Sequence, residues 1–189
     1  MREPLEKRAE TVVQLALARG ETLATVESCT AGLLAHLLSQ AEGASSVLHG
    51  GFIVYTKENK TASVGVPEEV LAEHTAVSGE VAEAMAAGGL ARCPAAFVMA
   101  ITGVAGPEPD EDCNPVGLVH VAVAARDGRM KAVKHEFGEL PKQEICAAAI
   151  GAALDLLEEF LRALQCGPHA DQVSDTAEQI NTSADRAKG

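Results

Sequence analysis

Residues 22–32 read Thr-Leu-Ala-Thr-Val-Glu-Ser-Cys-Thr-Ala-Gly. The apolar, β-branched run at 23–26 predicts a short buried strand, and leucines recur at helical spacing over 33–38. The polar residues between them therefore form a sharp strand-to-helix turn. Such a turn directs backbone N–H groups at the helix start towards a ligand, so Ser28 can be a nucleophile with a backbone oxyanion site. The alternative is that Ser28 or Thr30 only caps the helix.

Helical and strand patterns alternate along the rest of the chain. Apolar periodicity predicts helices over 4–19, from Pro67, from Ser78 to about Ala91, and over 141–164. Apolar runs predict further strands over 52–56, 96–102, 116–125 and 131–137. A hairpin turn at 126–129 makes the last two strands antiparallel. The pattern predicts an α/β fold, a three-layer α/β/α sandwich with a mixed β-sheet.

The length of 189 residues suits one domain with a substantial core. Apolar periodicity is lost after about residue 166. We expect one folded domain over 1–166 and a polar tail over 167–189 that is disordered or weakly helical.

Composition excludes several classes of function. A net charge of −12 and an aromatic content of 3% oppose nucleic-acid binding, which needs basic surfaces and stacking platforms. The charged N-terminus is no signal peptide, and no apolar run reaches the roughly 18 residues of a membrane span. Five dispersed cysteines without a CxxC motif indicate the reducing cytoplasm, and six histidines without ligand spacing predict no metal site.

Three predicted strands end in turns of polar and small residues, at Ser28, at 55–60 and at 102–106. If these strands are parallel neighbours, the turns share one edge of the sheet, where α/β proteins bind ligands. A serine nucleophile needs a base, and Lys57 or Lys60 is available. A free lysine has a pKa of about 10.4, so burial or a second cation must lower it. The alternatives are that both lysines are solvated and that the glycine pattern at 102–106 is accidental.

Several motifs occur in a fixed order over residues 5–162. They are Glu27-Ser28-Cys29-Thr30-Ala31-Gly32, Gly50-Gly51-Phe52-x-x-Tyr55-x-x-x-x-Lys60, Gly65-Val66-x-Glu68-Glu69, His74-x-Ala76-Val77-Ser78, Thr102-Gly103-x-Ala105-Gly106-Pro107 and Pro115-Val116-Gly117. With these motifs the chain resembles the nicotinamide-nucleotide amidase family, which is also the C-terminal domain of CinA-type competence/damage-inducible proteins.

The resemblance implies a homo-oligomer that deamidates nicotinamide mononucleotide to nicotinic acid mononucleotide and ammonia in pyridine-nucleotide recycling, without metal or cofactor. It implies that Ser28 is the nucleophile, Lys60 the base and Tyr55 a residue that orients the pair. The expected substrate contacts are Thr30, Gly32, Thr102, Gly103, Gly106 and Lys142, the last standing where the family has arginine.

The chain also departs from the family pattern. Ala31 replaces a glycine, Lys142 lacks the bidentate fork of arginine, and the loop at 108–113 is acidic where the family has glycines. Carboxylates near a phosphate site are unfavourable. A second hypothesis is therefore a nucleotide-binding or regulatory domain with weak turnover. A third is a bifunctional enzyme whose other domain is a separate protein.

Overall fold

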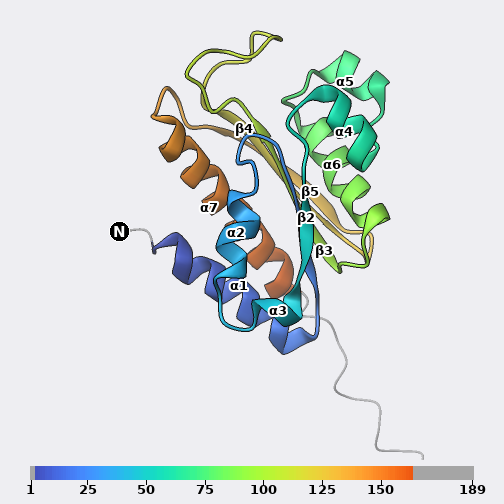
Figure 1. Cartoon of the computed structure of the whole chain (residues 1–189), viewed down its shortest axis with the longest axis vertical. Helices are drawn as coiled ribbons and strands as arrows, with labels where there is room; N and C mark the ends of the chain where they lie inside the picture. The colour runs from blue at the N-terminus through green and yellow to red at the C-terminus, as the bar shows by residue number, and fades with distance from the viewer. Residues whose placement is uncertain (1–2, 164–189) are drawn as a thin grey trace, which may run out of the picture.

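The computed structural model describes residues 3–163, and the tail predicted over 167–189 lies outside the described residues. Five strands form a single sheet in the order β2-β1-β3-β4-β5. Helices cover both faces of this sheet (Figure 1). The predicted three-layer α/β/α arrangement with a mixed sheet is therefore confirmed.

The predicted elements occur in the predicted order, and the short helix over 44–47 is one that the sequence pattern did not predict. The strands are β1 (Leu23–Glu27), β2 (Leu48–Ile53), β3 (Phe97–Gly103), β4 (Leu118–Ala125) and β5 (Met130–Glu136). The helices are α1 (Leu5–Arg19), α2 (Leu33–Ser39), α3 (Ala44–Val47), α4 (Lys57–Val64), α5 (Glu68–His74), α6 (Gly79–Arg92) and α7 (Lys142–Ala163).

Strand direction places the carboxyl ends of three strands together. β1 pairs in parallel with β2 on one side and with β3 on the other. β4 runs antiparallel to β3, and β5 antiparallel to β4, as the hairpin turn predicted. The segments that follow β1, β2 and β3 therefore leave the sheet at the same edge.

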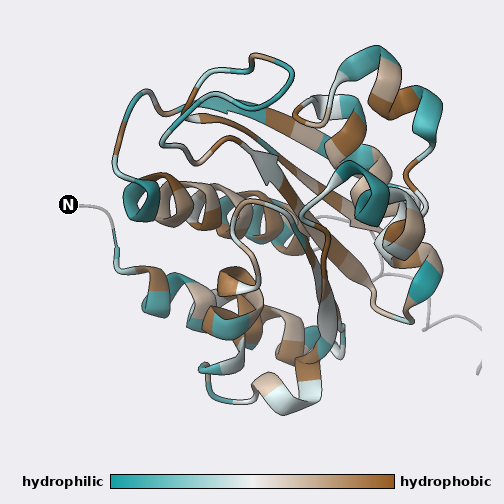
Figure 2. Ribbon diagram, turned by 45° about the horizontal axis from the view of Figure 1, so that its top comes forward, coloured by the Kyte–Doolittle hydropathy of each residue, from teal (hydrophilic) through white to brown (hydrophobic). Residues whose placement is uncertain are grey.

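The core lies in two layers, one on each face of the sheet. Along β3 the alternate residues Phe97, Met99 and Ile101 pack with α1, α2 and α7, whereas Val98 and Ala100 pack with α6. This alternation explains the near-continuous apolar sequence of β3, because both of its faces are covered. In Figure 2 the hydrophobic colour is concentrated on the strands and on the sides of the helices that face them.

The boundaries predicted for the second strand were wrong. We expected a strand over 52–56, after a glycine break, but β2 is Leu48–Ile53 and contains both glycines. A Cβ atom on Gly51 would lie 2.3 Å from Thr25 Oγ1 on the neighbouring strand, so a side chain does not fit there. Tyr55 consequently lies beyond the strand and is 59% exposed.

The connection between β3 and β4 is closed at its base. The Val104 N–H donates to the Leu118 carbonyl oxygen at 2.9 Å, and the Gly117 N–H donates to the Val104 carbonyl oxygen at 2.8 Å. Residues 105–116 therefore project from a paired base.

Among the described residues, no helix is long and apolar enough to cross a membrane.

Candidate active site

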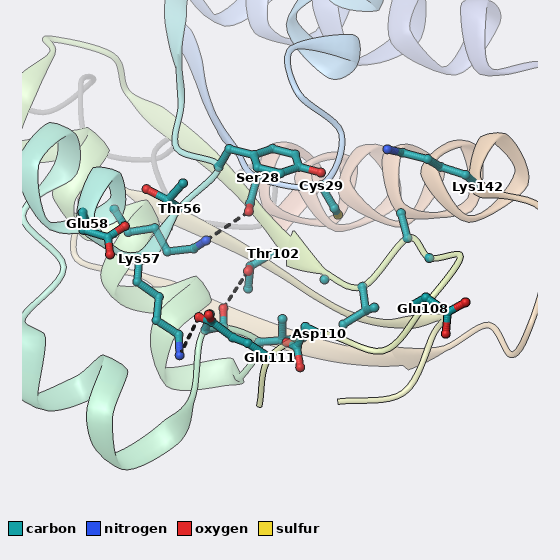
Figure 3. A pocket seen from close by; sticks show the side chains of 18 residues that line it. Ser28, Cys29, Thr56, Lys57, Glu58, Thr102, Glu108, Asp110, Glu111 and Lys142 are labelled. Atoms are coloured by element: carbon teal, nitrogen blue, oxygen red, sulfur yellow. Dashed lines mark hydrogen bonds and ion pairs between the residues drawn. The ribbon is translucent and has the colours of Figure 1, made fainter. Parts of the chain in front are cut away.

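Segments from the ends of β1, β2 and β3 surround a cavity of about 460 Å³ (Figure 3). Ser28 follows β1, Lys57 and Lys60 follow β2, and Thr102 is the penultimate residue of β3. All four line the cavity. The expectation that the three turns share one edge is therefore confirmed by the parallel pairing of their strands.

Ser28 and Lys60 are in direct contact. The Lys60 Nζ atom lies 3.0 Å from Ser28 Oγ, the bond dashed at Ser28 in Figure 3, and 3.3 Å from the Val54 carbonyl oxygen. Lys60 is 2% exposed and Ser28 is 6% exposed. Burial lowers the Lys60 pKa to about 8, and the nearby Lys57 charge makes a smaller contribution in the same direction. At neutral pH roughly a tenth of the Lys60 side chains are then uncharged and can accept a proton.

The helix α4 directs Lys60 inwards. Thr56 caps this helix by accepting a hydrogen bond from the Asn59 N–H at 3.2 Å. The Asn59 side chain donates to the Ile53 carbonyl oxygen at 2.9 Å, which ties the helix start to the end of β2. Lys60 stands one turn into the helix and is buried, whereas Lys57 in the first turn is partly exposed. Of the two candidate bases, Lys60 is thus the one beside Ser28.

Glu27, which the sequence analysis did not single out, organises the turn that carries Ser28. Its fully buried carboxylate accepts hydrogen bonds from the Thr25 and Thr30 hydroxyls and from three backbone N–H groups. Those N–H groups belong to Gly32, Leu34 and Ala35, at 3.0, 3.1 and 2.9 Å. Glu27 therefore accepts the hydrogen bonds of free N–H groups at the start of α2, as the side chain of a capping residue would.

This arrangement corrects two expectations about the turn. Neither Ser28 nor Thr30 caps α2, whose N-cap position is Gly32 and receives no side-chain cap bond. The N–H groups of Gly32, Leu34 and Ala35 bind Glu27, and that of Leu33 binds the Thr30 carbonyl oxygen, so none of them is left for a ligand. Thr30 and Gly32, expected to contact substrate, do not line the cavity and instead hold the Glu27 carboxylate.

A backbone donor nevertheless remains beside Ser28. In the described part of the chain, no other residue accepts a hydrogen bond from the Cys29 N–H, and Cys29 lines the cavity. The N–H of the residue after a nucleophile is a common oxyanion donor. Burial raises the pKa of the Cys29 thiol to about 12, so the side chain stays a neutral thiol and is not a competing nucleophile at neutral pH.

The acidic loop binds Lys57 and forms one wall of the cavity. Lys57 Nζ lies 2.8 Å from Asp112 Oδ2 and 2.9 Å from Glu111 Oε1. Hydrogen bonds to these two carboxylates raise the Lys57 pKa, so Lys57 remains a cation. Asp110 accepts hydrogen bonds from the Asp112 and Asn114 N–H groups, which fold the loop back on itself.

The remaining predicted site residues lie on the cavity wall. Thr102, Gly103 and Gly106 line it from the end of β3, and Lys142 lines it from the start of α7. The Thr102 hydroxyl donates to the Ala76 carbonyl oxygen at 2.7 Å. Figure 3 shows Lys142 at the other end of the cavity from Lys57.

Tyr55 does not contact the Ser–Lys pair as expected. Tyr55 lines the cavity at its exposed rim, and within residues 3–163 its hydroxyl makes no hydrogen bond to Ser28 or Lys60. No group of three or more histidine, cysteine or acidic side chains in the described residues could hold a metal ion.

Comparisons with known proteins agree with this fold. The CinA C-terminal domain family model matches residues 5–161. A CinA-like protein of Frankia casuarinae is 42% identical over 153 residues, which are 81% of this chain and 35% of that protein. The crystal structure of the competence/damage inducible protein CihA from Agrobacterium tumefaciens is 36% identical, with a TM-score of 0.80 over 86% of this chain and 99% of that chain.

A CinA superfamily protein from Escherichia coli is 32% identical, with a TM-score of 0.79 over 83% of this chain and 90% of that chain. The chain spans about a third of the length of the curated relatives it matches. The solved structures, in contrast, are covered almost completely. By sequence and by structure alike, this chain belongs to the CinA C-terminal domain family.

Proposed function

We propose that the chain is a Ser–Lys amidohydrolase that deamidates nicotinamide mononucleotide to nicotinic acid mononucleotide and ammonia. The observation that carries the proposal is the 3.0 Å contact between Ser28 Oγ and the buried Lys60 amine in an open cavity. A serine hydroxyl becomes an effective nucleophile when an adjacent base takes its proton. Because the Lys60 pKa is lowered to about 8, a fraction of its amine is neutral near pH 7 and can act as that base.

The first half-reaction forms an ester on the protein. Neutral Lys60 takes the Ser28 proton while Oγ bonds to the carboxamide carbon, and the negative charge develops on the former carbonyl oxygen. The Cys29 N–H donates to this oxygen, and one such donor is worth about 3–4 kcal/mol. The carbon–nitrogen bond then breaks, the Lys60 ammonium gives its proton to the leaving nitrogen, and ammonia departs.

The second half-reaction restores the serine. Lys60, neutral again, takes a proton from a water molecule whose oxygen attacks the ester carbon. Collapse of this intermediate breaks the bond to Ser28 Oγ, which regains the proton from Lys60. The product leaves as a carboxylic acid that ionises in water.

The other cavity residues place the nucleotide. Gly103 and Gly106 line the cavity and bring no side chain to it, so the nucleotide can approach their backbone closely. Lys142 offers a cation for the phosphate. In our proposal Tyr55 covers the nicotinamide ring at the rim and does not tune the Ser–Lys pair.

Ammonia release from nicotinamide mononucleotide by the purified chain tests the proposal, with free nicotinamide and unrelated amides as comparison substrates. Ser28→Ala should lower kcat by about a thousandfold or more. Ser45→Ala, an exposed serine outside the cavity, is the matched control and should keep full activity. Activity retained in Ser28→Ala would exclude this serine as nucleophile.

A second function is favoured by one observation, the four carboxylates on the cavity wall, at Glu58, Glu108, Asp110 and Glu111. Negative charge there opposes a phosphorylated substrate and is compatible with a regulatory nucleotide-binding domain of weak turnover. Calorimetry that detects tight mononucleotide binding, with no ammonia released over hours, would select this function over catalysis.

A further inference from the structure

An ion pair lies one helical turn from the base. Lys57 and Lys60 are three residues apart on α4, a spacing that puts their side chains on neighbouring positions of one helix face. Lys57 Nζ contacts both Asp112 oxygens, at 2.8 and 2.9 Å, and Glu111 at 2.9 Å. The first turn of the helix that carries the base is therefore fixed to the loop between β3 and β4.

The acidic side of this ion pair is itself held in place. Asp112 Oδ2 accepts a hydrogen bond from the Ala76 N–H at 3.3 Å, and the Ala76 carbonyl oxygen accepts one from the Thr102 hydroxyl at 2.7 Å. A continuous series of polar contacts thus runs from Lys57 through Asp112 and Ala76 to Thr102. It connects the helix carrying Lys60 to the strand end that forms the opposite wall of the cavity.

The same ion pair also contributes to the electrostatic environment of Lys60. A cation at Lys57 disfavours a second ammonium nearby, and the Lys57 charge does contribute to the lowered Lys60 pKa, after burial. Other charged or titratable groups face the cavity too: Cys29 beside Ser28, Glu58 on α4, Glu108, Asp110 and Glu111 on the loop, and Lys142 on α7. Two cations other than Lys60 line the cavity, Lys57 and Lys142, and of these two Lys57 is on the same helix as Lys60.

We propose that Lys57 and Asp112 are positioning residues that together set the ease with which Lys60 gives up its proton. Lys57 opposes protonation of Lys60, and Asp112 moderates this effect while fixing where the Lys57 charge lies. The inference rests on the proposed function, because proton release from Lys60 matters to catalysis only if Lys60 is the base.

Two substitutions in this one ion pair should act in opposite directions. Lys57→Met removes the cation and leaves Glu111 and Asp112 unpaired, so Lys60 holds its proton more tightly. Asp112→Asn leaves Lys57 less neutralised, so Lys60 releases its proton more readily. We expect shifts of about 0.3–1 pH unit, upward for Lys57→Met and downward for Asp112→Asn. Mere loosening of the site would admit water to Lys60 and shift both variants upward.

Two measurements test this in the full chain. One is the pH dependence of kcat/KM for nicotinamide mononucleotide, whose acid limb reports the free enzyme. The other is an NMR titration of the Lys60 side chain, assigned with Lys60→Arg, which needs no turnover. The matched control is Lys131→Met, which breaks the exposed Lys131–Glu159 ion pair between β5 and α7, also at 2.8 Å, and should shift neither curve.

Opposite shifts of the two variants in the NMR titration would support the inference, and shifts of one sign or none would overturn it. The activity profile should follow the titration. If the wild-type chain releases no ammonia while the NMR shifts are opposite, the proposed function fails and the electrostatic coupling stands. If ammonia is released and the shifts agree in sign, the proposed function stands and the role of Lys57 and Asp112 fails.

Discussion

The Lys60 amine is bonded on two sides, 3.0 Å from Ser28 Oγ and 3.3 Å from the Val54 carbonyl oxygen. The second contact leaves the amine little freedom to turn away from the serine. Val54 directly follows β2, and its N–H donates to the Glu27 carbonyl oxygen at 2.8 Å. The geometry of the pair is therefore set by the junction of β1 and β2, and not by the flexible lysine stem alone.

Catalysis should depend on pH with a half-maximum near 8. The base acts only when it is neutral, and burial lowers the Lys60 pKa to about 8, so kcat/KM should rise as the pH increases from 6 to 9. A pH–rate profile for ammonia release measures this. An acid limb centred near the ordinary carboxyl range of about pH 4 would instead indicate an acidic residue as base.

Glu27→Gln should destabilise the protein. The glutamine amide would direct its own N–H groups at donors that now bind a carboxylate, leaving buried groups unpaired at a cost of about 2–4 kcal/mol. Urea denaturation measures the loss. Glu10→Gln, an exposed acid on α1, is the control and should stay within about 0.5 kcal/mol of wild type. Equal stability of both variants would contradict the capping role of Glu27.

Ala31→Gly should stabilise the protein. Ala31 has a φ of 50°, in the left-handed region, which costs a residue with a Cβ about 1–2 kcal/mol. Glycine removes this strain but gains freedom in the unfolded chain, so the net gain should be about 0.5–1 kcal/mol. Thermal denaturation checks the sign. A lower melting temperature would show that the Ala31 methyl group makes packing contacts that outweigh the strain.

Lys142→Arg should favour the phosphorylated substrate. Arginine can bind a phosphate with two parallel N–H groups, whereas lysine acts as a point charge. We expect kcat/KM for nicotinamide mononucleotide to rise about three- to tenfold. Nicotinamide riboside, which has no phosphate, is the internal control and should change little. Equal gains on both substrates would place Lys142 away from the phosphate.

Added salt should increase activity on the mononucleotide. Carboxylates on the cavity wall repel the phosphate, and about 200 mM salt screens this repulsion over distances beyond about 7 Å. We expect kcat/KM to rise about twofold or more from about 20 to 200 mM sodium chloride. Glu108→Gln, which removes one wall carboxylate, should flatten this dependence. A steady decrease with salt would mean that the lysines dominate the field.

Much of the fold could be predicted because apolar periodicity reports burial directly. The alternating packing of β3 and the Ser78 cap of α6, which accepts from the Val81 N–H at 3.2 Å, follow from local sequence. The extent of β2 did not, because Gly50 and Gly51 have the composition of a turn. Their place inside a strand depends on the approach of Thr25 from the neighbouring strand.

The sequence indicated which residues gather at the site better than it indicated the hydrogen bonds that they make. Residue types at the strand ends identified Ser28 and left Lys57 and Lys60 as alternatives, because the inward face of α4 depends on where the helix begins. Glu27 was missed because a carboxylate at the end of a buried strand has the same sequence appearance as the polar turn after it. Its one signal is the absence of a capping side chain at Gly32.

The hydrogen bonds at Val104 and Gly117 allow the loop between them to change during evolution independently of the sheet. Insertions, deletions and changes of charge between these two residues leave the strand pairing intact, because the base of the loop is already closed. Natural variation can therefore remodel one wall of the cavity while the placement of Ser28 and Lys60, which depends on β1 and β2, stays unchanged. Exchange of this segment between homologues is a practical route to new ligand preferences beside the same Ser28–Lys60 pair.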